Sequence, residues 1–168
     1  RGYALGPLLL VLLACLLVFT GSVSARNLSD WPMCSNDEGQ SSRNTVIATC
    51  TAVIDTAPMG DVRLPVALFN RAVAYQGQRQ LDRAIVDYNE VLRFDPKDAR
   101  ALGNRGLAYA DKGDFARAIA DYDRALTFMP RDAKVIFTRG NAYAALGQAD
   151  RAMADYNESI RLDRTDPL

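Results

Sequence analysis

The 168-residue sequence contains no histidine, and its 20 lysines and arginines are balanced by 20 aspartates and glutamates. Without histidine there is no imidazole base, which excludes Ser-His-Asp and Cys-His catalytic sites and the usual histidine-containing zinc sites. A nucleic-acid-binding protein needs a surplus of lysine and arginine to neutralise phosphates, and this charge balance provides none. The sequence therefore predicts a protein that does not bind nucleic acid, and it excludes much of known enzyme chemistry.

Long apolar runs are also scarce, because the longest, residues 8–19, has twelve residues without a polar side chain. A bilayer-spanning helix normally needs about 20. This run follows Arg1 and precedes small residues that end at Ala25, a pattern typical of a secretory leader cleaved after Ala25. The alternatives are an uncleaved anchor and a lipoprotein in which Cys15 becomes the lipidated N-terminus. We expect residues 1–25 to be a signal peptide and the protein to be periplasmic or secreted, touching a membrane only if the leader is retained or Cys15 is lipidated.

Cysteine is rare as well, and cleavage of the leader would leave only Cys34 and Cys50. An even pair of cysteines in an exported protein favours a disulfide, with two free thiols as the alternative. The bond would close a loop of about 15 residues, worth roughly 3 kcal/mol in the chain-entropy model.

What the sequence does have is a repeat of 34 residues in three ungapped copies, 65–98, 99–132 and 133–166. Each copy has tyrosine at its eleventh and twenty-fourth places and alanine at its twentieth, as in Tyr75, Tyr88 and Ala84 of the first. Such spacings form one stripe on each of two amphipathic helices with apposed apolar faces. The predicted helix pairs are 65–77 with 81–94, 99–112 with 115–128, and 133–146 with 149–162.

Residues that start helices agree with this division. Asp98 and Asp132 precede the second and third copies as N-cap candidates, and Pro65 suits the first turn of the first copy. Residues 41–57 are predicted to form one more amphipathic helix, which caps the stack. The segment 26–64 is therefore an N-terminal region that leads into the repeats of residues 65–168, and a disulfide would hold its incoming chain against the capping helix.

This pattern closely resembles the tetratricopeptide repeat (TPR) over residues 65–166, and the second copy is similar to exported bacterial members. The resemblance implies an all-α, right-handed α-α superhelix of three helix pairs, whose first helices line a concave wall that holds a partner peptide. The family's carboxylate clamp has lysine and asparagine where this chain has Phe69 and Val73, which argues against a dedicated clamp for C-terminal peptides. The residues that the resemblance places on the wall are Phe69, Val73, Gln76, Arg100, Asn104, Leu107, Asp111, Lys134, Phe137 and Asn141.

A further regularity is an arginine at the seventh place and an aspartate at the twenty-third place of every copy. Because the two helices of a pair face each other, we expect partly buried guanidinium-carboxylate pairs that set the repeat geometry and bind no ligand. Whether each partner lies in the same copy or the next stays open. The arginines are Arg71, Arg105 and Arg139, and the aspartates are Asp87, Asp121 and Asp155.

The sequence contains no GxGxxG, phosphate loop, CxxC or nucleophile with an adjacent base. We therefore expect no enzymatic activity, no cofactor and no metal, and interpret the chain as a scaffold that binds another protein or peptide in the bacterial cell envelope. The alternative is a self-associating homodimer or a membrane-anchored subunit of a larger envelope complex. Self-association would use an uncovered strip on the last helix, formed by Met153, Tyr156, Ile160 and Leu162.

Overall fold

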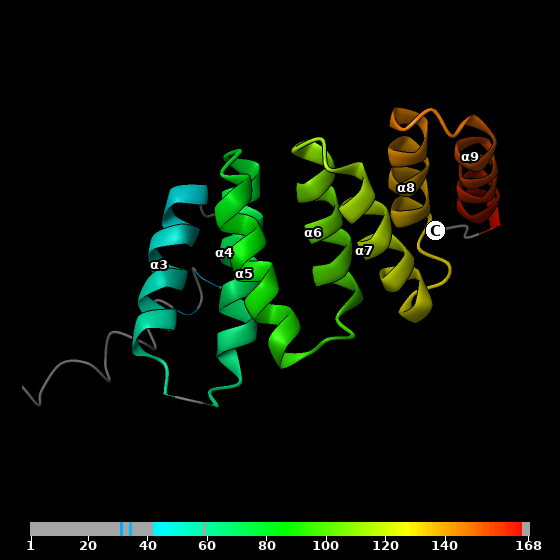
Figure 1. Ribbon diagram of the computed structural model, residues 1–168. Coiled ribbons are helices and arrows are strands. Elements are labelled where there is room, and N and C mark those ends of the chain that lie inside the picture. Colours follow the sequence, from blue (N-terminus) through cyan, green and yellow to red (C-terminus); the bar gives the residue numbers. More distant parts are fainter. Residues whose placement is uncertain (1–30, 32–33, 35–41, 59, 166–168) are drawn as a thin grey trace, which may run out of the picture.

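The structure is a computed structural model that describes residues 31, 34, 42–58 and 60–165. In this part of the chain all regular structure is helical (Figure 1). The predicted leader, with Cys15, and most of the predicted loop before the capping helix lie outside the described residues. The helices are α3 (Arg43–Thr56), α4 (Arg63–Gly77), α5 (Leu81–Phe94), α6 (Ala99–Asp111), α7 (Phe115–Phe128), α8 (Ala133–Ala145) and α9 (Ala149–Thr165).

Short polar side chains fix where several of these helices begin. The Asp98 carboxylate accepts hydrogen bonds from the backbone N–H groups of Arg100 and Ala101, and the Asp132 carboxylate accepts one from Val135. Both predicted N-caps are thus confirmed. These bonds satisfy N–H groups that have no partner within a helix, which stabilises each start.

Two helices are longer than predicted, for local reasons. Helix α4 starts at Arg63 because the Asp61 carboxylate accepts the Arg63 backbone N–H at 2.9 Å and also pairs with its guanidinium. Helix α9 continues to Thr165, beyond the predicted residue 162. The third copy has Arg164 where the earlier copies have Pro96 and Pro130, so no proline stops this helix.

The helices stack in sequence order as three antiparallel pairs, α4 with α5, α6 with α7 and α8 with α9, and α3 packs on α4 (Figure 1). Neighbouring first helices also touch, since α4 contacts α6 and α6 contacts α8. Within the described part of the chain, the second helices α5, α7 and α9 make no such contact with one another. The stack therefore curves with α4, α6 and α8 on its concave side.

Tyrosines fill the space between the helices of a pair. Tyr88 and Tyr122 are 0% and 1% exposed. A side-chain carbon at Gly106 would lie 2.7 Å from the Tyr122 ring, and one at Gly140 would lie 2.8 Å from the Tyr156 ring. Small residues at the eighth place are therefore required by the tyrosine that packs on them.

The predicted uncovered strip on α9 was partly wrong. Met153 and Ile160 are each 56% exposed, but Leu162 is only 4% exposed. Two residues advance a helix by about 200°, so Leu162 lies on the side of α9 opposite Ile160 and is buried there. In the described residues no helix combines the length and apolarity that crossing a bilayer demands.

Candidate functional site

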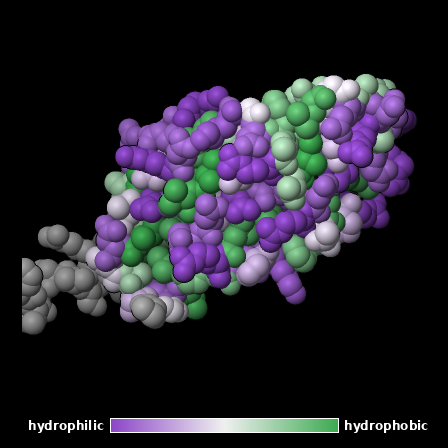
Figure 2. Space-filling model, viewed as in Figure 1, coloured by the Kyte–Doolittle hydropathy of each residue, from purple (hydrophilic) through white to green (hydrophobic). Residues whose placement is uncertain are grey.

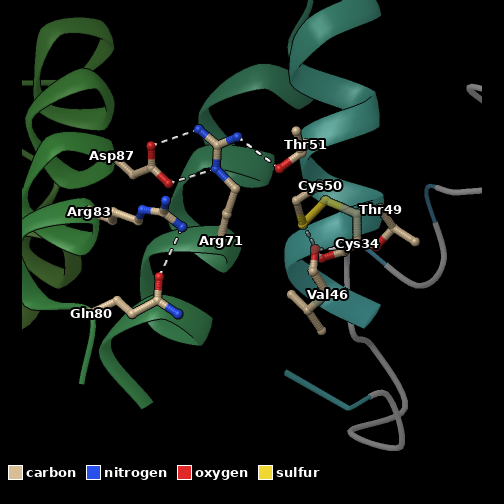
Figure 3. Close-up of polar contacts among 9 residues, drawn as sticks. All are labelled: Cys34, Val46, Thr49, Cys50, Thr51, Arg71, Gln80, Arg83 and Asp87. Atoms are coloured by element: carbon tan, nitrogen blue, oxygen red, sulfur yellow. Dashed lines mark hydrogen bonds and ion pairs between the residues drawn. A yellow bond between two sulfur atoms is a disulfide. The ribbon is translucent and has the colours of Figure 1, made fainter. Parts of the chain in front are cut away.

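One partly buried ion pair joins the two helices of each of the three repeats. Arg71 donates two hydrogen bonds to the Asp87 carboxylate, at 2.8 and 2.9 Å (Figure 3). The second and third repeats have the same fork, at 2.8 and 2.7 Å in each. The partners, Arg105 with Asp121 and Arg139 with Asp155, are 16 residues apart and belong to the same copy. This settles which copy supplies each partner.

The remaining guanidinium nitrogen of each arginine reaches the preceding unit. Arg71 donates to the Thr51 hydroxyl of α3 at 3.0 Å, and Arg105 donates to the Asn89 side chain of α5 at 2.7 Å. Arg139 bonds Asp123 of α7 in the same way. The hydrogen bond to its own aspartate raises the pKa of each arginine, against the opposing effect of burial. Each arginine is therefore a structural link among three helices.

The N-terminal end of the stack is fastened by a disulfide between Cys34 and Cys50 of α3 (Figure 3). The Cys34 carbonyl also accepts a hydrogen bond of 2.9 Å from the Asn70 side chain of α4. Both cysteines are 0% exposed, and Trp31 packs on the same cluster. This arrangement holds the incoming chain against the capping helix.

The concave side contains a cavity of about 140 Å³ between α6 and α8. It brings together four predicted wall residues, namely Arg100, Asn104, Leu107 and Lys134. Lys134 is exposed and forms no ion pair with any described side chain. Two cations and an amide beside an aliphatic floor can hold a carboxylate or a backbone carbonyl next to an apolar group.

The cavity lining also includes Asp132, Val135 and Thr138, which the sequence analysis did not place on the wall. Thr138 occupies the sixth place of the third copy, as Asn104 does in the second. The 34-residue period was therefore the signal that would have found Thr138. Asp132 and Val135 belong to the N-cap of α8, which no side-chain pattern on the wall indicates.

Two phenylalanines of the predicted wall, Phe69 on α4 and Phe137 on α8, lie outside the cavity lining. The Phe69 ring contacts the Tyr88 ring edge-on at 5.9 Å, and the Arg100 guanidinium lies 5.1 Å from the centre of the Phe69 ring. Phe137 is 48% exposed, and its ring centre is 5.5 Å from that of Tyr156. Figure 2 shows apolar patches that interrupt the largely hydrophilic surface near α4 and α5 and near α8. The Phe69 and Phe137 rings offer contact area for an apolar ligand side chain.

The tyrosines of the core approach the same wall with their hydroxyls. Tyr88 donates to the Gln76 side chain at 3.0 Å, and Tyr156 donates to the Asn141 side chain at 2.9 Å. The Tyr122 hydroxyl is buried and has no hydrogen-bond partner among the described residues. Burial raises the pKa of Tyr122 to about 12, and the nearby Thr138 side chain acts in the opposite direction. Gln76 and Asn141 thus orient core tyrosines on the wall.

The two remaining wall residues lie apart from the cavity. Val73 is 44% exposed on α4, and Asp111 pairs with Arg79 at 3.2 Å near the end of α6. Among the described residues, no cluster of histidine, cysteine or carboxylate side chains is arranged to hold a metal ion.

Sequence profiles described as tetratricopeptide repeat match residues 69–136 and 133–166. Together these matches cover more than half of the chain. The chain belongs to the tetratricopeptide-repeat family. The predicted family and the predicted all-α superhelix of TPR helix pairs are thereby confirmed. No curated protein matches the sequence.

Several solved structures are similar to this chain in fold. A crystal structure of MamA superposes with a TM-score of 0.74 at 16% identity, covering 90% of this chain and 84% of that one. MamA from Desulfovibrio magneticus RS-1 gives 0.74 at 14% identity, with 86% and 80% covered. The first TPR of Spaghetti (RPAP3), bound to the HSP90 peptide SRMEEVD, gives 0.60 at 27% identity, with 63% and 84% covered.

Proposed function

We propose that the protein is a non-enzymatic scaffold that binds a segment of a partner protein on its concave surface. The observation that carries this proposal is the cavity between α6 and α8, which gathers Arg100, Asn104 and Lys134 around Leu107. The similar RPAP3 domain, bound to an HSP90 peptide, supports a peptide as the kind of ligand. The family supports protein binding in place of chemistry.

The residues of the wall indicate what the ligand offers. Lys134 and Arg100 favour an acidic side chain or a carbonyl-rich backbone in the cavity, and Phe69 and Phe137 favour apolar side chains on either side. We therefore propose a segment with an acidic residue between apolar ones.

The test has two steps, purification of the partner and measurement of its affinity. The parent protein is used to isolate a partner from envelope material, and the partner is then titrated with purified variants. Lys134→Glu and the double variant Phe69→Ala/Phe137→Ala are each expected to weaken binding at least about tenfold. Val86→Ala changes a residue of α5 that is 59% exposed and serves as the matched control. Equal affinities for Lys134→Glu and the control would refute the proposed site.

We propose further that the protein works outside the cytoplasm, in the cell envelope. The disulfide between Cys34 and Cys50 supports this, because such bonds persist in oxidising compartments. The leader-like segment before Ala25 supports it independently. Mass spectrometry of the protein from fractionated cells is expected to find a chain that begins at Arg26. A lipid-modified chain that begins at Cys15 would contradict the proposed cleavage, and a cytoplasmic chain would contradict export.

A further inference from the structure

Helix α9 presents an apolar face that helix α5 keeps covered. In the first repeat, Ile85 and Leu92 of α5 are 9% and 8% exposed, and α6 packs against that helix. Met153 and Ile160 occupy the same places two repeats further along and are each 56% exposed. The face that α5 uses to join the next unit is therefore covered on α9 by none of the described residues.

A polar group lies in the middle of this face. At the twenty-fifth place of the first two repeats, Asn89 and Asp123 each accept a hydrogen bond from the arginine of the next unit. Asn157 has that place in the third repeat and is exposed, and no described side chain donates to it. Its amide is able both to donate and to accept.

The exposed residues of this face are arranged almost symmetrically about Asn157. Asp150 and Arg164 lie seven residues before and after it, and Met153 and Ile160 lie four before and three after. Alternate spacings of three and four place all five side chains on one stripe of the helix. Asp150 and Arg164 are exposed and form no ion pair with a described residue.

An antiparallel copy of the same helix matches this stripe, with opposite charges, apolar side chains and amides facing one another. With a two-fold axis at Asn157, Asp150 faces Arg164 of the second copy, and Met153 lies within one residue of the position opposite its Ile160. The two Asn157 amides then lie opposite each other and form a mutual hydrogen bond. Antiparallel helix dipoles also favour this arrangement. Such a self-complementary patch is the requirement for a two-fold dimer.

We infer that two copies of this protein associate through antiparallel α9 helices. The interface is short, so the dimer is weak, with a Kd on the order of 10–100 µM. Because α9 lies outside the cavity between α6 and α8, dimerisation leaves the proposed peptide site open. The inference rests on the face of α9 alone. A negative result for the dimer therefore leaves the proposed peptide site untouched, and a negative result for that site leaves the dimer untouched.

Sedimentation equilibrium of the purified protein tests the inference. The average mass is expected to rise from one copy towards two between about 1 and 200 µM. Ile160→Asp is expected to weaken association at least about tenfold, whereas Val86→Asp, a matched change of an exposed aliphatic residue on α5, leaves it unchanged. Circular dichroism checks that both variants keep the helical content of the parent.

A charge swap tests the proposed register. Asp150→Arg and Arg164→Asp are each expected to weaken the dimer, and the two changes combined restore it. Under oxidation, Asn157→Cys is expected to form a disulfide-linked dimer and Val86→Cys is not. A protein that stays a single copy at the highest concentration would overturn the inference. So would a dimer that Ile160→Asp leaves intact, because another surface or another helix would then be responsible.

Discussion

At the residue scale, Arg79 is the position where the first repeat departs from the other two. Its φ is 61°, close to the 80° and 73° of Gly113 and Gly147 at the same turn. A side chain in this left-handed conformation costs about 1 kcal/mol relative to glycine. Its ion pair with Asp111 adds little stabilising free energy, because the Arg79 side chain is 68% exposed to solvent.

We therefore predict that Arg79→Gly stabilises the protein by about 0.5–1 kcal/mol. A thermal melt measures the change, with Gly113→Ala as the opposite control, which is expected to lower the melting temperature. A lower melting temperature for Arg79→Gly would show that the ion pair with Asp111 outweighs the backbone strain.

Tyr122 gives a prediction for the response to alkaline pH. Its pKa is about 12 in the folded protein, against 10.0 for an ordinary tyrosine. The folded state therefore holds this proton more tightly, so the stabilisation is complete below pH 10 and is lost as the pH rises towards 12. We expect the free energy of unfolding to fall by about 2 kcal/mol across this window.

Tyr122→Phe is the matching variant. It removes a buried hydroxyl that has no hydrogen-bond partner in the described structure, so at pH 7 it is expected to be neutral or stabilising. Denaturant titrations at pH 7, 10 and 12 should show a smaller alkaline loss than in the parent. An unchanged alkaline loss would mean that other tyrosines, such as Tyr88, account for it.

At the scale of elements, the ion pair of each repeat joins its two helices and the preceding unit. We predict that Arg105→Leu destabilises the protein by about 3–5 kcal/mol, because Asp121 would stay buried without its partner. The Asp121 side chain is only 6% exposed. The control is Arg93→Leu, since the Arg93 side chain is 77% exposed and the loss is expected to stay within about 0.5 kcal/mol.

A thermal or denaturant melt compares these variants. Replacing both Arg105 and Asp121 by leucine should cost less than Arg105→Leu alone, because no charge is then left buried. Equal stability of Arg105→Leu and the parent would contradict a structural role for the pair.

Most of the helix bounds and all three ion pairs were predictable from the sequence. The 34-residue period predicted α5 and α7 with the bounds that the structure has, because the apolar stripe runs the full length of each helix. The ends of α4 and α9 differ from the prediction, since the Asp61 hydrogen bond to the Arg63 N–H and the absence of a proline in the third copy decide them. The arginine-aspartate pairs were predictable because both residue types recur.

The third contact of each arginine was not predictable, because its acceptors differ in type. They are Thr51, Asn89 and Asp123. On the concave wall, the resemblance to the TPR family implied the face of α4, α6 and α8. It could not show that Arg100 lies over the Phe69 ring or that a cavity forms between α6 and α8, because both depend on the curvature of the stack.

At the scale of the whole molecule, the disulfide is expected to matter mostly at one end. Reduction of Cys34–Cys50 should lower stability by about 2–4 kcal/mol. In a stack of repeats each unit contacts only its neighbours, so hydrogen exchange should rise in α3 and α4 and change little in α8 and α9. Uniform loss of protection along the chain would contradict this independence of the two ends.

The curvature of the molecule gives the central claim, that a partner binds the side lined by α4, α6 and α8. The most direct measurement is photo-crosslinking in intact cells, with a photoreactive side chain at Leu107 in the cavity or at Val86 on α5. We predict a defined adduct with a partner protein from position 107, none from position 86, and loss of the adduct in the Lys134→Glu background. Equal adducts from both positions, or no adduct from position 107, would contradict the account.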